Sequence, residues 1–302
     1  MIRGDRDDSV GPELPGAVIR AAVETALAED LGWGDVTSDT LVPAGLEASA
    51  VMVARQAGVV AGLEVAREVF LAVDASLDVE LLARDGATVE AGAALLRVSG
   101  RARSILAGER VALNFVQRLS GTASLAARFV EAVRGTGARI VDTRKTTPGL
   151  RVLEKYAVRC GGAHNHRFHL GDAVLLKDNH RAAIAAAGET LAQAVARARA
   201  SLPHTVTIEI EVDTAAELEQ ALEAQPDAIL LDNMAPEELR VSVRRIRQAR
   251  PGTRIEASGG VTLLTVRAMA ETGVDLISVG ALTHSAPAFD ASLDFRIGGV
   301  AP

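Results

Sequence analysis

The chain is poor in cysteine and in aromatic residues. Its 302 residues include one cysteine, Cys160, and only 3% aromatic residues. One cysteine excludes an internal disulfide and any metal site built from several thiolates, which suits a reducing compartment such as the cytoplasm. Because so few rings leave little surface on which bases could stack, the composition argues against a nucleic-acid-binding protein.

Excess positive charge and long apolar runs are also missing. The formal net charge is -7, whereas phosphate backbones recruit basic surfaces, so we expect no nucleic-acid partner. No apolar run approaches the roughly 18 residues that a membrane span requires. The first ten residues, MIRGDRDDSV, lack the apolar segment of a secretory signal. We therefore expect a cytoplasmic protein with no membrane partner, in which any phosphate is met by locally concentrated charge.

What the chain does contain is enough apolar residue, 48%, to bury a substantial core. Helical apolar spacing predicts a helix over 16–31, and 46–100 carries short alternating runs separated by glycine, which predict strands with a helix near 63–73. Residues 103–133 are predicted to be helical, with a break near Ser120 and Gly121.

A regular alternation of strands and helices begins after this point. Near-continuous apolar runs predict strands that are each followed by a helix, which indicates a buried parallel sheet. The spacing favours an α/β barrel, complete or incomplete, over a doubly wound open sheet. The predicted strands are 138–144, 172–178, 206–212, 227–232, 253–259 and 274–280, and the main helical stretches are 182–201, 215–224, 236–249 and 262–272.

In such a barrel the ligand site lies at the carboxyl ends of the strands, and here these ends are polar. The first predicted strand runs into DTRKTTPG, in which Arg144 and Lys145 stand beside hydroxyl groups. Cations continue through the next segment. Their density in an acidic protein indicates an anion site. They are Arg151, Lys155, Arg159, His164, His166, Arg167 and His169.

The same segment also offers candidate ligands for a metal site. Cys160, His164, His166 and His169 are plausible zinc ligands, but their spacing matches no standard finger and the flanking arginines would repel a divalent cation. Cys160 as a nucleophile is an equally weak hypothesis, because Gly161 and Gly162 indicate a turn and not an activating helix start.

Lys177 follows the second predicted strand. A desolvated lysine there could form a Schiff base, as in an aldolase, or stay charged and hold an anionic substrate. The neighbouring arginines favour the second role.

Carboxylates end two later strands, with Glu209 and Glu211 in IEIEV and Asp232 in LLDN. Glu211 and Asp232 suit a Mg²⁺ ion that also contacts phosphate, since magnesium prefers a few carboxylate oxygens together with ligand and water. Ion pairs with Arg144, Arg167 or Lys177 are nearly as good an explanation.

Glycines follow the last two predicted strands. Ser258, Gly259 and Gly260 end one strand, and Gly280 ends the next. Backbone N–H groups in such loops can approach a phosphate closely, with help from the dipole of the following helix. Two successive loops of this kind predict a phosphate site.

Taken together, these segments resemble the quinolinate phosphoribosyltransferase family, also called nicotinate-nucleotide pyrophosphorylase (carboxylating). The resemblance spans residues 29–295. It is carried by EDLGWGDVTSD, ERVALNFVQRLSGTA, DTRKTTPGLRVLEKYAVRCGGAHNHRFHL, LLKDNH, IEIEVDT, ILLDNM, IEASGGV and GVDLISVGALTHSAPAFDASLDF.

The resemblance implies an α/β fold in two domains. An N-terminal α/β sandwich domain would cover 1–115, an incomplete, open α/β barrel would cover 116–285, and the tail 286–302 would return to the first domain. It also implies a homodimer in which Arg110 of one copy enters the active site of the other.

The resemblance further implies the substrates and their ligands. Quinolinate would be bound by Arg144, His166, Arg167 and Lys177 with Arg110, and phosphoribosyl pyrophosphate (PRPP) by Lys145, Glu211 and Asp232, with its phosphate at Ser258, Gly259, Gly260 and Gly280. The catalytic set would be Lys145, Lys177, Glu211 and Asp232, with Mg²⁺ as cofactor held by Glu211 and Asp232. The products would be nicotinate mononucleotide, pyrophosphate and CO2.

A relative associated with molybdenum transport shares the fold. A different activity and a catalytically silent binding protein are therefore the remaining alternatives.

Overall fold

The computed structural model describes residues 13–297 and divides the chain into two compact units. The first unit comprises Met1–Ala127, Thr147–Gly162 and Ala286–Pro302, and the second comprises Arg128–Thr146 and Ala163–Ser285. The first ten residues, on which the signal-peptide prediction rests, lie outside the described range. Within that range, no helix is long and apolar enough to cross a membrane.

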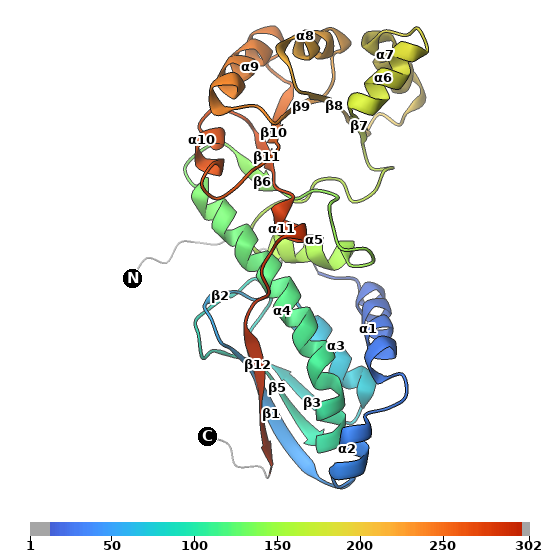
Figure 1. Ribbon diagram of the computed structural model, residues 1–302, viewed down its shortest axis with the longest axis vertical. Coiled ribbons are helices and arrows are strands. Elements are labelled where there is room, and N and C mark those ends of the chain that lie inside the picture. Colours follow the sequence, from blue (N-terminus) through green and yellow to red (C-terminus); the bar gives the residue numbers. More distant parts are fainter. Residues whose placement is uncertain (1–12, 298–302) are drawn as a thin grey trace. The chain divides into compact units, whose positions relative to one another are not determined.

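The first unit is built on an antiparallel sheet of order β12-β1-β5-β3 (Figure 1). The strands are β1 (Glu47–Ala54), β3 (Asp78–Leu81), β5 (Ala94–Arg101) and β12 (Ala291–Ile297). Alternate residues of β1 are buried, which is the period-2 pattern that the sequence shows. A short pair, β2 (Gly58–Val59) with β4 (Thr88–Val89), completes the strands.

Helices supply the other layer of this unit. They are α1 (Gly16–Leu31), α2 (Val36–Leu41), α3 (Leu63–Val73), α4 (Ala102–Ala132) and α5 (Arg151–Cys160). Helix α3 packs on β3 and β5, and α1 packs on α3. The predicted helices over 16–31 and 63–73 and the α/β character of this domain are confirmed.

The predicted break near Ser120 and Gly121 is wrong, because α4 continues through both residues. Gly121 is needed there for another reason. A Cβ atom at this position would lie 2.1 Å from the carbonyl oxygen of Pro287, so glycine lets the C-terminal segment approach the helix. The backbone N–H of Phe289 donates to the carbonyl of Gln117 at 2.8 Å in the same contact.

Residues 147–162 pack within the first unit, although they stand between two strands of the second. Buried Glu154 accepts from Arg118 at 2.8 Å, and the Tyr156 hydroxyl donates to Asp85 at 2.8 Å. Lys155 of α5 is fully buried in this unit. Three of the cations that the sequence places near the anion site, Arg151, Lys155 and Arg159, therefore belong to α5 and the first unit.

The second unit is a six-stranded sheet of order β6-β11-β10-β9-β8-β7 in which every pair is parallel (Figure 1). Its strands are β6 (Arg139–Val141), β7 (Val174–Leu176), β8 (Ile208–Val212), β9 (Ala228–Asp232), β10 (Arg254–Ser258) and β11 (Leu276–Ser278). From β7 to β11 each strand neighbours the next in the chain, and β6 pairs with β11 but not with β7. In a doubly wound sheet the order of the strands along the chain would reverse in the middle of the sheet, and here it does not. The prediction of an open barrel is therefore confirmed.

The helices of this unit follow the strands in turn: α6 (Asp178–Ala186), α7 (Leu191–Ser201), α8 (Ala215–Ala224), α9 (Pro236–Ala249), α10 (Val266–Ala270) and α11 (Ala281–His284). The single helical stretch predicted over 182–201 is two helices. Gly188 has φ +77° and Thr190 begins α7 by accepting from the backbone N–H of Gln193 at 3.2 Å. The helix predicted over 262–272 is reduced to α10.

Candidate functional site

Most of the predicted site residues lie in the second unit, at or just beyond the carboxyl ends of its parallel strands. Arg144 and Lys145 follow β6, Lys177 follows β7, and Asp232 and Ser258 are the last residues of β9 and β10. Glu211 lies one residue before the end of β8, and Gly280 follows β11. Because parallel strands end at one edge of the sheet, this edge gathers cations, carboxylates and glycine loops.

Two arginines crowd together at this edge. Burial lowers the pKa of Arg167, and the nearby positive charge of Arg144 lowers it further, against the opposing charge of Glu209. The Nε of Arg144 is buried without a hydrogen-bond partner. A buried guanidinium N–H that lacks an acceptor is costly, so this pair of cations is prepared for an anionic ligand.

The segment that carries Arg167 is held by a buried acid. Asp142 accepts from the backbone N–H of His166 at 2.8 Å and from the side chain of Asn165 at 2.7 Å. Farther along, Asp172 accepts from the backbone N–H groups of Phe168 and His169. Arg167 itself donates to the carbonyl of Ala173 at 2.8 Å, which leaves the rest of its guanidinium for a ligand.

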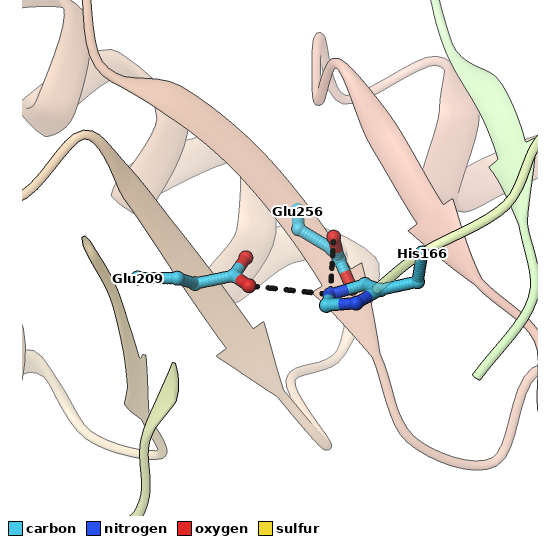
Figure 2. A group of neighbouring side chains, drawn as sticks. All are labelled: His166, Glu209 and Glu256. Carbon is cyan, nitrogen blue, oxygen red and sulfur yellow. Dashed lines mark hydrogen bonds and ion pairs between the residues drawn. The ribbon is translucent and has the colours of Figure 1, made fainter. Parts of the chain in front are cut away.

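Two buried carboxyl groups converge on one nitrogen of the His166 ring (Figure 2). Its Nε2 is 3.2 Å from Glu209 of β8 and 3.7 Å from Glu256 of β10. Its Nδ1 accepts from the backbone N–H of Arg167 at 2.7 Å. An acceptor nitrogen carries no proton, so the ring is the Nε2–H tautomer and donates toward the acids.

Burial, reinforced by the negative charge of Glu209, raises the pKa of Glu256 to about 8. The ligand atoms of His166, Glu209 and Glu256 lie within 4.8 Å of one another, the one such group among residues 13–297. A metal-bound histidine usually donates its other ring N–H, whereas Nδ1 here accepts. The group therefore suits a hydrogen-bonded network better than a metal ion. The other candidate zinc ligands, Cys160, His164 and His169, do not join His166 in this group.

Lys177 forms an ion pair with Glu211 across the ends of β7 and β8. Its side chain is 47% exposed, which is not the desolvated setting that a Schiff-base lysine requires. Its backbone N–H donates to Nδ1 of His180 at 3.0 Å, which fixes the start of α6. The geometry favours a charged lysine that holds an anion.

Carboxylates concentrate near the end of β9. Burial raises the pKa of Asp213, and the negative charge of Asp232 raises it further. Asp232 accepts from the side-chain amide of Asn233 at 2.6 Å. Asn233 has φ +53°, a left-handed conformation that is uncommon outside glycine and that clusters at functional sites. Two acids at neighbouring strand ends form a region suited to a cation.

The glycine loops lie beside these acids. Gly259 has φ +92°, and a Cβ atom there would lie 2.1 Å from Oδ1 of Asn233. A Cβ atom on Gly280 would lie 3.0 Å from Nε2 of His284 and 3.2 Å from Cδ of Lys145. Glycine at position 280 thus leaves room for the side chains of His284 and Lys145 above the backbone of its loop.

The predicted site residue Arg110 and the candidate nucleophile Cys160 lie in the first unit. Arg110 is exposed on α4. Burial raises the pKa of the Cys160 thiol to about 12, so that it is not an activated nucleophile.

Sequence reasoning did not assign a site role to Asp142, Asn233, Glu256 or His284. A signal existed for Glu256, which is a charged residue in the apolar run of β10, as Glu209 is in β8. His284 lies in the quoted segment GVDLISVGALTH, but only the fold brings it over Gly280.

Comparison with known proteins covers nearly the whole chain. Residues 35–120 match the family model described as quinolinate phosphoribosyl transferase, N-terminal domain, and residues 122–294 match its C-terminal domain. The chain is 45% identical over 281 residues to the probable nicotinate-nucleotide pyrophosphorylase [carboxylating] of Synechocystis sp., covering 92% of this chain and 93% of the relative. It is 45% identical to the corresponding protein of Mycobacterium leprae, over 91% of this chain and 96% of that one.

Solved structures agree with these relatives. The crystal structure of NadC from Streptococcus pyogenes superposes with a TM-score of 0.87 at 40% identity, covering 95% of this chain and 100% of that one. The nicotinate-nucleotide pyrophosphorylase from Francisella tularensis gives 0.86 at 37% identity, over 94% and 98% of the two chains.

Proposed function

The chain belongs to the quinolinate phosphoribosyltransferase family, and we propose that it transfers the phosphoribosyl group of PRPP to quinolinate with decarboxylation. The products are nicotinate mononucleotide, pyrophosphate and CO2, and the reaction serves de novo NAD biosynthesis. The observation that carries this proposal is the pair Arg144 and Arg167, crowded at the strand ends with a buried N–H that lacks an acceptor.

Quinolinate is a dianion, and two guanidinium groups can bind its adjacent carboxylates through paired N–H donors. Lys177 adds a third positive charge, and Arg110 of a second copy adds a fourth. Both ring nitrogens of His166 have partners inside the protein, so its predicted contact with quinolinate would come from another part of the ring. This set would orient the ring nitrogen toward the ribose, and such orientation lowers the barrier.

PRPP would occupy the other part of the same edge. The backbone N–H groups of Ser258, Gly259, Gly260 and Gly280 suit its phosphate, and Lys145 lies next to Gly280 to neutralise the charge. Glu211 and Asp232 would face the ribose and its leaving group.

Mg²⁺ fits the residues near the end of β9. Oxygen ligands from Glu211 and Asp232 are of the kind that magnesium prefers. Burial raises the pKa of the neighbouring Asp213, and the negative charges of Asp232, Glu217 and Asp178 add to that effect, which supports a region suited to a cation. When bound, the ion would neutralise charge on the departing pyrophosphate. Asn233 would hold the carboxylate of Asp232 in place for it.

The chemistry then follows in two parts. As the bond from ribose C1 to pyrophosphate breaks, Glu211 and Asp232 stabilise the positive charge that develops on the ribose, and the quinolinate nitrogen bonds to C1. The resulting pyridinium draws electrons from the bond between C2 and its carboxylate. CO2 leaves, the electron pair remains on C2, and a proton completes the product there.

A homodimer is part of the proposal. Trp33, Val36 and Leu41 near α2 are 102%, 71% and 77% exposed, which is unusual for large apolar residues placed so close in sequence. A second copy that covers them would be consistent with Arg110 reaching the site of its partner. The cytoplasm, where both substrates would be met, is the proposed location.

The test is a turnover assay with quinolinate, PRPP and Mg²⁺ that follows nicotinate mononucleotide and CO2, with nicotinate as the competing acceptor. Product from quinolinate alone, lost when Mg²⁺ is chelated, is the expected result. Lack of product from a folded dimer would contradict the proposed activity and favour a binding protein. A borohydride-trapped adduct on Lys177 would favour an aldolase instead.

A further inference from the structure

Glu256 has no part in the proposed reaction, yet it is one of the most deeply buried charged residues. It is 1% exposed, and its Oε1 has no hydrogen-bond partner. A buried acid with an unsatisfied oxygen costs stability. Figure 2 shows its carboxyl group beside the ring of His166, with Glu209 approaching the same ring nitrogen. Its position points to a role through His166.

The protons of this group can be placed from geometry. Two ionised carboxylates beside Nε2 would draw a second proton onto the ring, which would have to sit on Nδ1. Nδ1 accepts from the backbone N–H of Arg167 at 2.7 Å, and two donors cannot face each other there. The proton therefore belongs on an acid. Glu256 is the more buried of the two, with a side chain 2% exposed against 10% for Glu209, and burial favours the neutral form.

The charge of this group bears on the substrate-binding arginines. Glu209 already opposes the positive charge of Arg167, which stands beside Arg144. Asp172 on the same segment opposes it as well. An ionised Glu256 would add a further buried negative charge beside His166, the neighbour of Arg167 in the chain, and a dianion would be held less well.

We propose that Glu256 is a positioning residue for the dianionic substrate: as a buried neutral acid 3.7 Å from Nε2 of His166, it leaves the ring in the tautomer that accepts from the Arg167 amide and adds no negative charge beside the arginine pair. This inference rests on the proposed function, because quinolinate is the dianion in question.

A pH dependence follows. The groups that face Glu256 are Glu209 from β8 and His166 from its loop, with Arg254 on its own strand and the hydroxyl of Ser278 on β11. Because the pKa of Glu256 is raised to about 8, the neutral form dominates at neutral pH and is lost in mildly alkaline solution. Binding of quinolinate weakens over that range, whereas the rate of the bound complex changes little.

The experiment compares three forms of the full-length enzyme from about pH 6.5 to about pH 9.5: wild type, Glu256→Gln and the control Glu223→Gln, which makes the same chemical change at an exposed residue of α8. We expect the KM of wild type for quinolinate to rise roughly tenfold from about pH 7 to about pH 9, with kcat within about twofold. Glu256→Gln should remove this rise, and Glu223→Gln should keep it. The same alkaline rise in wild type and Glu256→Gln, or no rise in either, overturns the inference.

Two further measurements keep the result decisive. Glu256→Asp retains a buried acid that can ionise, so the alkaline rise in the KM for quinolinate should persist in it, and its loss would overturn the inference if the glutamine variant does not fold. Calorimetric titration with quinolinate alone gives Kd against pH without turnover. An enzyme that binds quinolinate with the expected pH dependence but makes no product contradicts the proposed function while supporting the role of Glu256.

Discussion

Replacing Gly259 by alanine tests how closely the loops after β9 and β10 are joined. Gly259 has φ +92°, and the new Cβ would lie 2.1 Å from Oδ1, 2.6 Å from Cγ and 2.7 Å from the backbone nitrogen of Asn233. The side-chain atoms could rotate away, but the backbone nitrogen is held by a 3.0 Å hydrogen bond to the carbonyl of Ser258. The clash must therefore move backbone.

The expected cost has two parts. A non-glycine residue in this conformation costs on the order of 1–3 kcal/mol, and forcing an extra methyl into a filled space costs roughly 1–3 kcal/mol more. We expect Gly259→Ala to lower the free energy of unfolding by about 4 kcal/mol. Gly260 is the matched control, because it has φ +58° and nothing lies within 4 Å of its Cβ position. Gly260→Ala should cost only about 1–2 kcal/mol.

Urea unfolding of the two variants measures this difference. Kinetics supply a second readout, because a displaced Asn233 releases the carboxylate of Asp232, and the apparent affinity for PRPP and Mg²⁺ should fall about tenfold or more in Gly259→Ala. Equal stability of the two variants would refute the packing argument. A destabilised Gly259→Ala enzyme with wild-type KM for PRPP would refute the link between Asn233 and the site.

Three other outcomes are expected. Arg167→Ala should raise the KM for quinolinate by about 100-fold or more and change that for PRPP little, since a charge-assisted bidentate contact is lost; steady-state kinetics with each substrate varied checks this. Trp33→Asp should shift the dimer toward monomer and reduce activity in proportion, as light scattering and specific activity measured on the same samples would show. Glu256→Gln should raise the free energy of unfolding by a few kcal/mol relative to wild type above about pH 8, and by little below about pH 4. The reason is that the pKa of Glu256 is raised in the folded state, so its ionisation destabilises the folded wild-type protein increasingly as the pH rises from the unfolded-state pKa to the folded-state pKa. Urea unfolding at the two pH extremes measures the difference.

The sequence predicted those features of the fold that depend on local periodicity. The helices over 215–224 and 236–249 and all six strands of the parallel sheet follow from apolar runs with polar ends. What the sequence did not show depended on contacts between distant segments. Gly121 looks like a helix break until Pro287 is known to lie against it, and the grouping of 147–162 with the first unit depends on side chains such as Glu154 and Tyr156 meeting partners far along the chain.

The site shows the same division. Arg144, Lys177 and Asp232 could be placed at one edge of the sheet because residues that follow parallel strands meet there, whatever the details of packing. Glu256 could not be assigned a role in this way, because its meaning depends on which strand lies next to β10 and on which nitrogen of His166 accepts. A charged residue in an apolar strand indicates that some partner must lie beside it, but only the folded structure shows which residue that partner is.

The strand order explains how one edge can serve two anionic substrates. Following the sheet from β6 through β11, β10, β9 and β8 to β7, the strand ends present cations, then glycine loops, then carboxylates, then a lysine. The glycine loops thus stand between Lys145 on β6 and the acids on β9 and β8. PRPP, with a phosphate at one end and a metal-binding pyrophosphate at the other, matches this sequence of loops and acids. Arg144 follows β6 and Lys177 follows β7, but the loop that carries His166 and Arg167 reaches Glu209 of β8, so the cations proposed for quinolinate are not confined to the β6 end of the sheet.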